Sequence, residues 1–172
     1  MSTPPFILEL REHVGHRLLC LIGVTAVVID TDERILLHRR ADDGRWSTPG
    51  GIVEPGEQPA AALVREIEEE TDLRVLPEAL VSAVMEAPHT YPNQDRVQFL
   101  DLTFRCRPVS GSARVNDDES LDVRWFDYSD LPAMDERIMR RIDHAREGAV
   151  GWFDPHSTGP WTPGVSPLPP AA

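Results

Sequence analysis

The sequence has few cysteines, no excess of positive charge and no long apolar run. Only two of its 172 residues are cysteines, and both Cys20 and Cys106 lie in apolar or alternating stretches, so we expect buried free thiols and no disulfide framework. The 17 Lys and Arg residues are outnumbered by 29 Asp and Glu residues, which leaves a net charge of −12 at pH 7. This balance disfavours stable binding to nucleic acid, or to an anionic membrane, through a basic surface. No stretch is long and apolar enough to span a bilayer.

The sequence also lacks a recognisable secretory signal. Its first residues, Met-Ser-Thr-Pro-Pro, have neither a basic flank nor a long apolar core, so we expect a cytoplasmic protein. A length of 172 residues is enough for one domain with a substantial core.

Hydrophobic periodicity predicts a mixture of strands and helices. We expect helices over residues 6–14, 59–71 and 136–147, and strands over residues 18–29, 34–39, 80–87, 96–107 and 121–128. The turn at Thr31-Asp32-Glu33 is expected to join the first two strands as a hairpin. Both faces of residues 96–107 are partly apolar, which indicates a central strand. Mixed strands with a helix on each side suggest an α/β/α sandwich.

The composition changes towards the end of the chain. Six of the sixteen prolines follow Gly148, so regular structure is not expected there. This predicts an N-terminal helical extension over residues 1–17, a main domain over residues 18–147 and a Pro-rich tail over residues 148–172. Trp152, Phe153 and Trp161 are unusual in a free tail, and we expect them to dock on the domain or at a dimer contact.

An acidic helix follows a glycine-rich loop between Gly51 and Leu73. Glu66, Glu69 and Glu70 stand at positions i, i+3 and i+4 and therefore share one helix face. Like charges at this spacing each cost roughly 0.2–0.5 kcal/mol, so either solvent screens them or a cation lies among them. Clustered hard oxygen ligands suit Mg²⁺ or Mn²⁺.

The same window, GIVEPGEQPAAALVREIEEETDL, resembles the Nudix box. Gly51, Glu57, Arg65 and the Glu-rich turn match the fixed positions, and Asp72 stands where the pattern has glycine. The resemblance implies an α/β (α+β) fold, a Nudix-type α/β/α sandwich with a mixed β-sheet. It also implies metal-dependent hydrolysis of a phosphoanhydride. Because a glycine after a helix usually adopts a left-handed conformation, Asp72 affects the expected loop more than the expected metal site.

The resemblance also implies roles for individual residues. Glu66, Glu69 and Glu70, with the backbone carbonyl of Gly50, would bind the metal, and Glu66 is a candidate for activating water. Gly51, Glu57 and Arg65 would support the site, the last two as a pair that holds the loop against the helix.

Further candidates lie outside the box. Nudix enzymes often add an acidic residue from the region before the last strand, and Glu119 is our first choice as a further catalytic residue, followed by Asp118 and Asp122. His38, Arg39 and Arg40 end the second strand, where they either meet substrate phosphates or face solvent. Candidate substrate contacts also include Trp46, for which a core position is favoured, and His89 and Tyr91, for which a surface position is the alternative.

The leading functional hypothesis is hydrolysis of the pyrophosphate bond of a nucleoside diphosphate linked to another moiety. Pro88 lies 15 positions after Leu73, as in the ADP-ribose type, and Tyr91 lies 18 positions after it, as in the dinucleoside polyphosphate type. A nucleotide sugar is a further candidate. The alternatives are a (deoxy)nucleoside triphosphate pyrophosphatase that cleans the nucleotide pool, and a Nudix module that senses a nucleotide without cleaving it. Nudix proteins are often dimers, so a homodimer is a further expectation.

Overall fold

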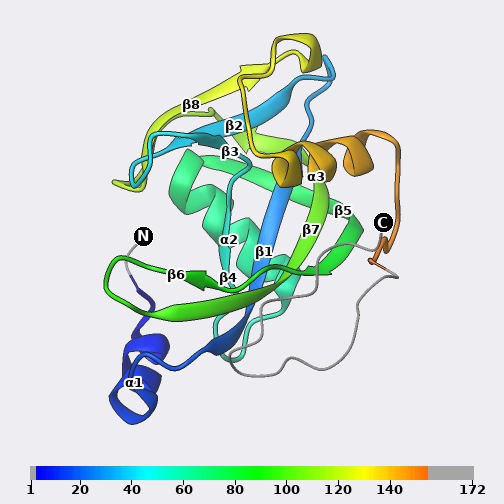
Figure 1. The fold of residues 1–172 in the computed structure, drawn as a ribbon. Helices are drawn as coiled ribbons and strands as arrows, with labels where there is room; N and C mark the ends of the chain where they lie inside the picture. Colours follow the sequence, from blue (N-terminus) through cyan, green and yellow to red (C-terminus); the bar gives the residue numbers. More distant parts are fainter. Residues whose placement is uncertain (1–2, 155–172) are drawn as a thin grey trace.

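The computed structural model describes residues 3–154, which form two β-sheets and three α-helices (Figure 1). The helices are α1 (Pro5–Val14), α2 (Pro59–Thr71) and α3 (Glu136–Arg146), and a 3-10 helix, η1, covers Tyr128–Asp130. The strands are β1 (Leu19–Val28), β2 (Ile35–Arg40), β3 (Trp46–Ser47), β4 (Gly50–Ile52), β5 (Leu73–Met85), β6 (His89–Thr90), β7 (Arg96–Gly111) and β8 (Ser120–Phe126). None of the helices within residues 3–154 is long and apolar enough to cross a membrane.

The larger sheet is mixed, as the sequence predicts. Its strand order is β4-β1-β7-β5, with the short β6 paired to β7. β1 and β7 run parallel, whereas the other pairs in this sheet are antiparallel. The predicted central position of residues 96–107 is confirmed, because β7 lies between β1 and β5. The smaller sheet is antiparallel and has the order β3-β2-β8.

The two long helices pack on opposite faces of β1, which confirms the sandwich. Val24, Ala26 and Val28 belong to the same apolar cluster as buried residues of α2, whereas Val27 and Ile29 belong to the cluster that contains buried residues of α3. This follows from the strand geometry, in which successive side chains point to opposite faces. β1 therefore reads as a nearly continuous apolar run because both of its faces are covered.

A buried polar network fixes α3 to the larger sheet. The carboxylate of Asp101 on β7 accepts hydrogen bonds from the hydroxyls of Thr25 (2.6 Å) and Thr103 (2.8 Å). Arg141 on α3 lies 3.0 Å from the same carboxylate and 2.8 Å from that of Glu86. The buried charge of Asp101 is thus compensated by three donors, as a buried carboxylate requires.

The expected hairpin of the first two strands is wrong. β2 pairs with β3 and β8 in the smaller sheet, and only an isolated bridge between Ile29 and Ile35 connects it to the end of β1. The intervening turn is closed by the Asp30 carboxylate, which accepts hydrogen bonds from the backbone N–H groups of Asp32 and Arg34, both at 2.9 Å. A turn signal fixes the reversal of the chain but not the partner of the strand that follows it.

The start of one strand, an unexpected short strand and one burial prediction also need correction. β5 begins at Leu73 rather than Leu80, and it tolerates Pro77 because it is an edge strand with irregular pairing at that point. The expected loop after it contains the short β6. Cys20 is exposed rather than buried, because the start of β1 extends beyond the apolar cluster of α2; Ile22, on the same side of the strand, is 44% exposed.

Part of the C-terminal segment docks on the domain. The backbone of Trp152 donates a hydrogen bond to the carbonyl of Val81 and accepts one from the N–H of Ala83, so it lies along β5. Its ring centroid lies 4.6 Å from that of His144 on α3. Phe153, by contrast, is 65% exposed, and Trp161 lies outside the described residues.

The two cysteines should differ strongly in reactivity. Cys20 is exposed, whereas Cys106 is 1% exposed and burial raises the pKa of its thiol to about 12. Because the thiolate is the reactive form, a thiol-specific reagent should label one cysteine in the native protein and two in denaturant. The Cys20→Ser variant should show no fast labelling. Fast labelling of both native thiols would contradict the burial of Cys106.

Candidate active site

The helix α2 presents an apolar face to the core and an acidic face to the glycine-rich loop. Pro59 occupies the first turn, where its missing N–H costs nothing, and Leu63 and Ile67 are fully buried. The helix ends at Thr71, and Asp72 directly after it adopts the left-handed conformation (φ 55°) expected of the glycine it replaces. Its carboxylate accepts a hydrogen bond from Arg114 at 2.8 Å, so the loop after the helix is held despite the substitution.

Two glycines let the loop approach both β1 and α2 closely. A Cβ on Gly50 would lie 2.2 Å from the carbonyl oxygen of Val24, and a Cβ on Gly51 would lie 2.0 Å from the carboxyl carbon of Glu66. Any side chain at either position would therefore displace backbone or the Glu66 carboxyl. Both glycines are required by close approach, since neither has a positive φ.

Arg65 joins the loop to the helix, as the sequence analysis expects. Its guanidinium donates two hydrogen bonds to the carboxylate of Glu57, at 2.8 and 2.9 Å, and one to the carbonyl of Ile52 at 3.3 Å. Glu57 in turn accepts a hydrogen bond from the backbone N–H of Glu54. The guanidinium beside Glu57 holds the pKa of that carboxyl below its usual value. This bidentate pair fixes both ends of the loop.

Glu70 is a nearly buried carboxylate in an acidic environment. It is 3% exposed and accepts a hydrogen bond from the N–H of Gly50 at 3.2 Å. Burial raises the pKa of Glu70 well above its usual value, and the charges of Glu66, Asp117 and Glu119 raise it further. Acidic groups from two separate segments of the chain therefore act on one buried carboxyl.

The other two box carboxylates lie in different surroundings. Glu66 accepts a hydrogen bond from the N–H of Ile52 at 3.3 Å, and its pKa is raised by burial although the adjacent Arg65 opposes this. The side chain of Glu69 is 56% exposed and lies 3.2 Å from Arg65. Glu66 is thus the partly buried carboxyl beside the loop, and Glu69 is the one that faces solvent.

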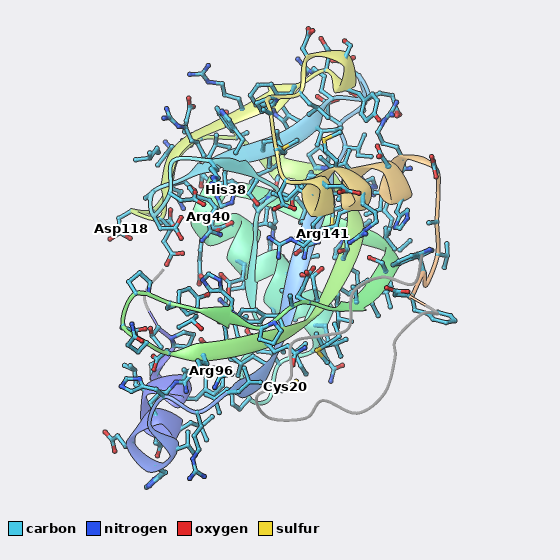
Figure 2. All side chains as sticks on the ribbon, in the orientation of Figure 1. Cys20, His38, Arg40, Arg96, Asp118 and Arg141 are labelled. Carbon is cyan, nitrogen blue, oxygen red and sulfur yellow. The ribbon has the colours of Figure 1, made fainter. Side chains whose placement is uncertain are left out.

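A depression next to Glu70 brings basic and acidic groups together. It is open to solvent, and its lining comes from β2, α2 and the loops that follow β2 and precede β8: His38, Arg40, Asp42, Glu70 and Glu119. Figure 2 shows His38, Arg40 and Asp118 on the same side of the molecule. The sequence predicts Arg40, Glu70 and Glu119 as site residues, and the fold brings these three together.

His38 contributes to this depression as a neutral, buried imidazole. Its Nδ1 lies 2.9 Å from the hydroxyl of Ser120 and 3.9 Å from the carboxylate of Glu70. Burial, together with the charge of Arg40, lowers the pKa of His38 to about 4. Sequence reasoning did not single out Ser120 or Asp117, because the only signal was their position at the end of an acidic loop.

The remaining candidates lie apart from this depression. Arg39 donates to the carbonyl of Gly44, and Trp46 packs edge-to-face on Phe126 with ring centroids 4.9 Å apart, in the cluster that includes α3. Trp46 therefore lies against the core, the position that the sequence analysis favours. Asp118 is exposed and Asp122 pairs with Arg124.

His89 and Tyr91 form a separate aromatic pair. His89 is exposed and packs edge-to-face on the half-buried Tyr91, with ring centroids 4.7 Å apart. Arg40 and Asp42 are the charged groups that act on the Tyr91 hydroxyl, whose pKa is raised mainly by burial. Tyr91 does not line the depression.

The carboxylate oxygens of this site suit a hard divalent cation in their chemical type and in their charge. Glu66 and Glu70 are oxygen donors whose pKa values are raised mainly by burial, and neighbouring acidic groups raise both further; a cation would relieve both costs. Within residues 3–154, no group of three or more His, Cys, Asp and Glu side chains is arranged so that it could hold a metal ion. Arg65 lies 3.0 Å from Glu66 and 3.2 Å from Glu69, so joint binding of a cation requires these side chains to leave the guanidinium.

Replacing Glu70 by Gln should stabilise the metal-free protein. Because the pKa of Glu70 is raised in the folded state, the native protein binds more protons than the unfolded chain, and its stability falls as pH rises above the unfolded value. The Glu70→Gln variant has no ionisable group at this position, so its stability does not fall with pH for this reason. In EDTA at pH 8 we expect its free energy of unfolding to exceed that of the parent by about 1 kcal/mol or more, and the difference to shrink towards pH 5.

The matched control is Glu69→Gln, which removes one carboxylate from the exposed side of the same turn. Urea unfolding at the two pH values should show little pH-dependent difference for this variant. An equal effect of both substitutions, or a Glu70→Gln effect that does not change with pH, would contradict the burial of the Glu70 charge.

Comparison with known proteins agrees with this geometry. A "MutT-like protein" of Streptomyces ambofaciens is 36% identical over 129 residues, which cover 74% of this chain and 78% of the relative. The human "8-oxo-dGDP phosphatase NUDT18" is 31% identical over 136 residues; these cover 76% of this chain but only 38% of that longer protein. The crystal structure of a MutT NUDIX hydrolase from Burkholderia pseudomallei superimposes with a TM-score of 0.62 at 27% identity, covering 73% of this chain and 98% of that one.

The family model of the NUDIX domain matches residues 21–145 of this chain. That range contains the loop, the acidic helix and the depression beside Glu70. The chain therefore belongs to the Nudix hydrolase family.

Proposed function

We propose that the protein is a metal-dependent hydrolase that cleaves the pyrophosphate bond of a nucleoside diphosphate linked to another moiety. ADP-ribose, nucleotide sugars and dinucleoside polyphosphates are the candidate substrates. The observation that carries this proposal is the position of Arg40 in the same depression as Glu70 and Glu119. A cationic group that can bind phosphate oxygens thus lies directly beside the carboxylates that suit a divalent cation.

Glu66, Glu69, Glu70 and the carbonyl of Gly50 would hold Mg²⁺ or Mn²⁺. When bound, such an ion neutralises charge on the anhydride oxygens and lowers the pKa of a bound water. The chain itself prepares this arrangement, because the N–H of Gly50 already bonds Glu70 and the N–H of Ile52 already bonds Glu66. The loop and the helix are therefore joined before any ion arrives.

Two carboxyls are candidates for accepting a proton from the attacking water. Burial raises the pKa of Glu66, which brings it closer to the range in which a general base works at neutral pH. Glu119 lines the depression from the opposite segment. Arg40 would orient the phosphate groups, and Arg65 with Glu57 would keep the loop in place around them.

A specific observation supports a second candidate substrate class. The human relative is named as an 8-oxo-dGDP phosphatase and the Streptomyces relative as MutT-like. Oxidised or canonical (deoxy)nucleoside di- and triphosphates therefore belong in the same test. Of the two residues that hint at substrate type, Tyr91 is half-buried and packs on an apolar cluster, whereas Pro88 is exposed. This favours Tyr91 as the substrate contact.

Replacing Glu69 by Gln should abolish metal-dependent turnover without loss of stability. The substitution removes one proposed metal ligand and one like charge from the helix, at a side chain that is 56% exposed. The measurement is phosphate release with Mg²⁺ or Mn²⁺ from ADP-ribose, nucleotide sugars, dinucleoside polyphosphates, 8-oxo-dGDP and canonical and oxidised nucleoside triphosphates. We expect at least a roughly hundredfold loss of kcat.

The matched control is Glu68→Gln, one residue earlier on the same helix, where the exposed Glu68 pairs only loosely with Arg74 at 3.9 Å. This variant should retain the activity of the parent. Equal activity of both variants would contradict the ligand assignment. A parent that cleaves no member of the panel, but whose melting temperature rises with one of them, would instead indicate a nucleotide-sensing module.

A further inference from the structure

The N-terminal helix α1 lies outside the matched domain, yet it is bonded to a loop next to the proposed site. The match begins at residue 21, whereas α1 ends at Val14. The contact is made by Arg11, whose side chain is only 10% exposed. Its guanidinium donates to the carbonyl of Arg96 at 2.9 Å and its Nε lies 3.3 Å from the carboxylate of Asp95.

Asp95 connects the turn between β6 and β7 to this helix. Its carbonyl accepts a hydrogen bond from the N–H of Tyr91 at 2.9 Å, which closes the turn. Its carboxylate lies 2.8 Å from Nδ1 of His16 and accepts a hydrogen bond from the side chain of Asn93 at 3.0 Å. Arg11 and His16 therefore hold the turn of residues 91–95 from outside the matched domain.

This turn carries Tyr91, which has two different surroundings. Its ring packs against an apolar cluster that includes Ile7 of α1 and Leu21 of β1. Its hydroxyl is within electrostatic reach of Arg40 and Asp42, which line the depression beside Glu70. In Figure 1, α1 and the turn before β7 lie on the same side of the molecule as the loop that follows β2.

Arg11 has more contacts than attachment of the helix requires. α1 is already held by Ile7, which is 4% exposed and belongs to the same cluster as Tyr91. The guanidinium of Arg11 donates to the carbonyls of Gly15 and Arg17 directly after α1, at 2.9 and 2.6 Å. It also reaches the Asp95 carboxylate and the Arg96 carbonyl at the end of the turn, so it joins the end of the helix to the turn.

We propose that α1 is a positioning element of the substrate site, in which Arg11 holds the turn of residues 91–95 and thereby sets the position of Tyr91, the side chain that receives the nucleoside part of the substrate. This inference rests on the proposed function of the depression. Arg11 acts through Tyr91 and does not itself touch substrate. A side chain held by such supporting contacts loses less freedom on binding its ligand, so the support contributes to affinity.

The test replaces Arg11 by Met, which keeps an apolar stem for packing and removes every donor. With the substrate that the panel identifies, KM should rise roughly tenfold while kcat stays within about twofold, because substrate binding weakens and the reacting groups are unchanged. The matched control is Arg17→Met, an exposed arginine shortly after the same helix. It should leave KM unchanged.

A second experiment distinguishes the positioning of Tyr91 by Arg11 from a purely structural role of Arg11. In a Tyr91→Ala background, Arg11→Met should change KM no further, because Arg11 acts only through Tyr91. Calorimetric titration with AMP, GMP, UMP and CMP measures binding without turnover, and the affinity for the monophosphate that binds should fall roughly tenfold in Arg11→Met. Binding of inorganic pyrophosphate should not change.

Several outcomes would overturn the inference. These are an unchanged KM, an equal fall of kcat together with a lower melting temperature, or independent effects of Arg11 and Tyr91. Failure of the proposed function is a different result: the parent would then release no phosphate from any panel member. In that case the monophosphate titrations decide alone, and equal affinities of parent and variant, or no binding to the parent, would reject the role of Arg11.

Discussion

The close contact of the Gly50–Gly51 strand with its two neighbours is the constraint on which the rest of the site depends. On one side the strand lies so near β1 that a Cβ at residue 50 would meet the backbone of Val24, and on the other the Glu66 carboxyl occupies the space that a side chain at residue 51 would need. Loop, sheet and acidic helix therefore cannot move independently. The backbone N–H groups of residues 50 and 52 bond the carboxylates of Glu70 and Glu66, so the geometry that excludes side chains also orients the acidic groups.

The electrostatics of the site follow from this packing. Carboxylates from α2 and from the loop before β8 act on one another in a partly desolvated place, and burial is the largest cause of the raised pKa at Glu66, Glu70 and Asp117. A helix gains no stability from such an arrangement. Arrangements that cost stability tend to occur where function requires them. The buried carboxylate of Glu70 among other acidic groups is such an arrangement, and it points to the functional site without any comparison to other proteins.

The features that the sequence predicts correctly are those determined by residues close to one another along the chain. The helix of the box, its pair Glu57 with Arg65 and the left-handed end at Asp72 are local, and the pattern of spacing and residue type is sufficient for them. The convergence of Arg40, Glu70 and Glu119 is not local, because β2 leaves β1 and joins β8 in a second sheet. The mistaken hairpin has the same origin. His38 and Ser120 meet through that unexpected pairing, and the exposure of Cys20 depends on where α2 stops covering the sheet.

The pair of Arg65 and Glu57 uses a guanidinium as its cation, and the same choice of cation holds for the whole molecule. All 17 basic residues of the sequence other than histidine are arginines, and no lysine occurs. A guanidinium keeps its proton under any condition in which a protein survives, whereas an ammonium group loses it in moderately alkaline solution. The cationic half of every arginine–carboxylate pair is therefore permanent, and among changes of pH only protonation of the carboxylate can dissolve it. The response to pH is one-sided: alkali leaves the arginine–carboxylate pairs intact, and acid removes them.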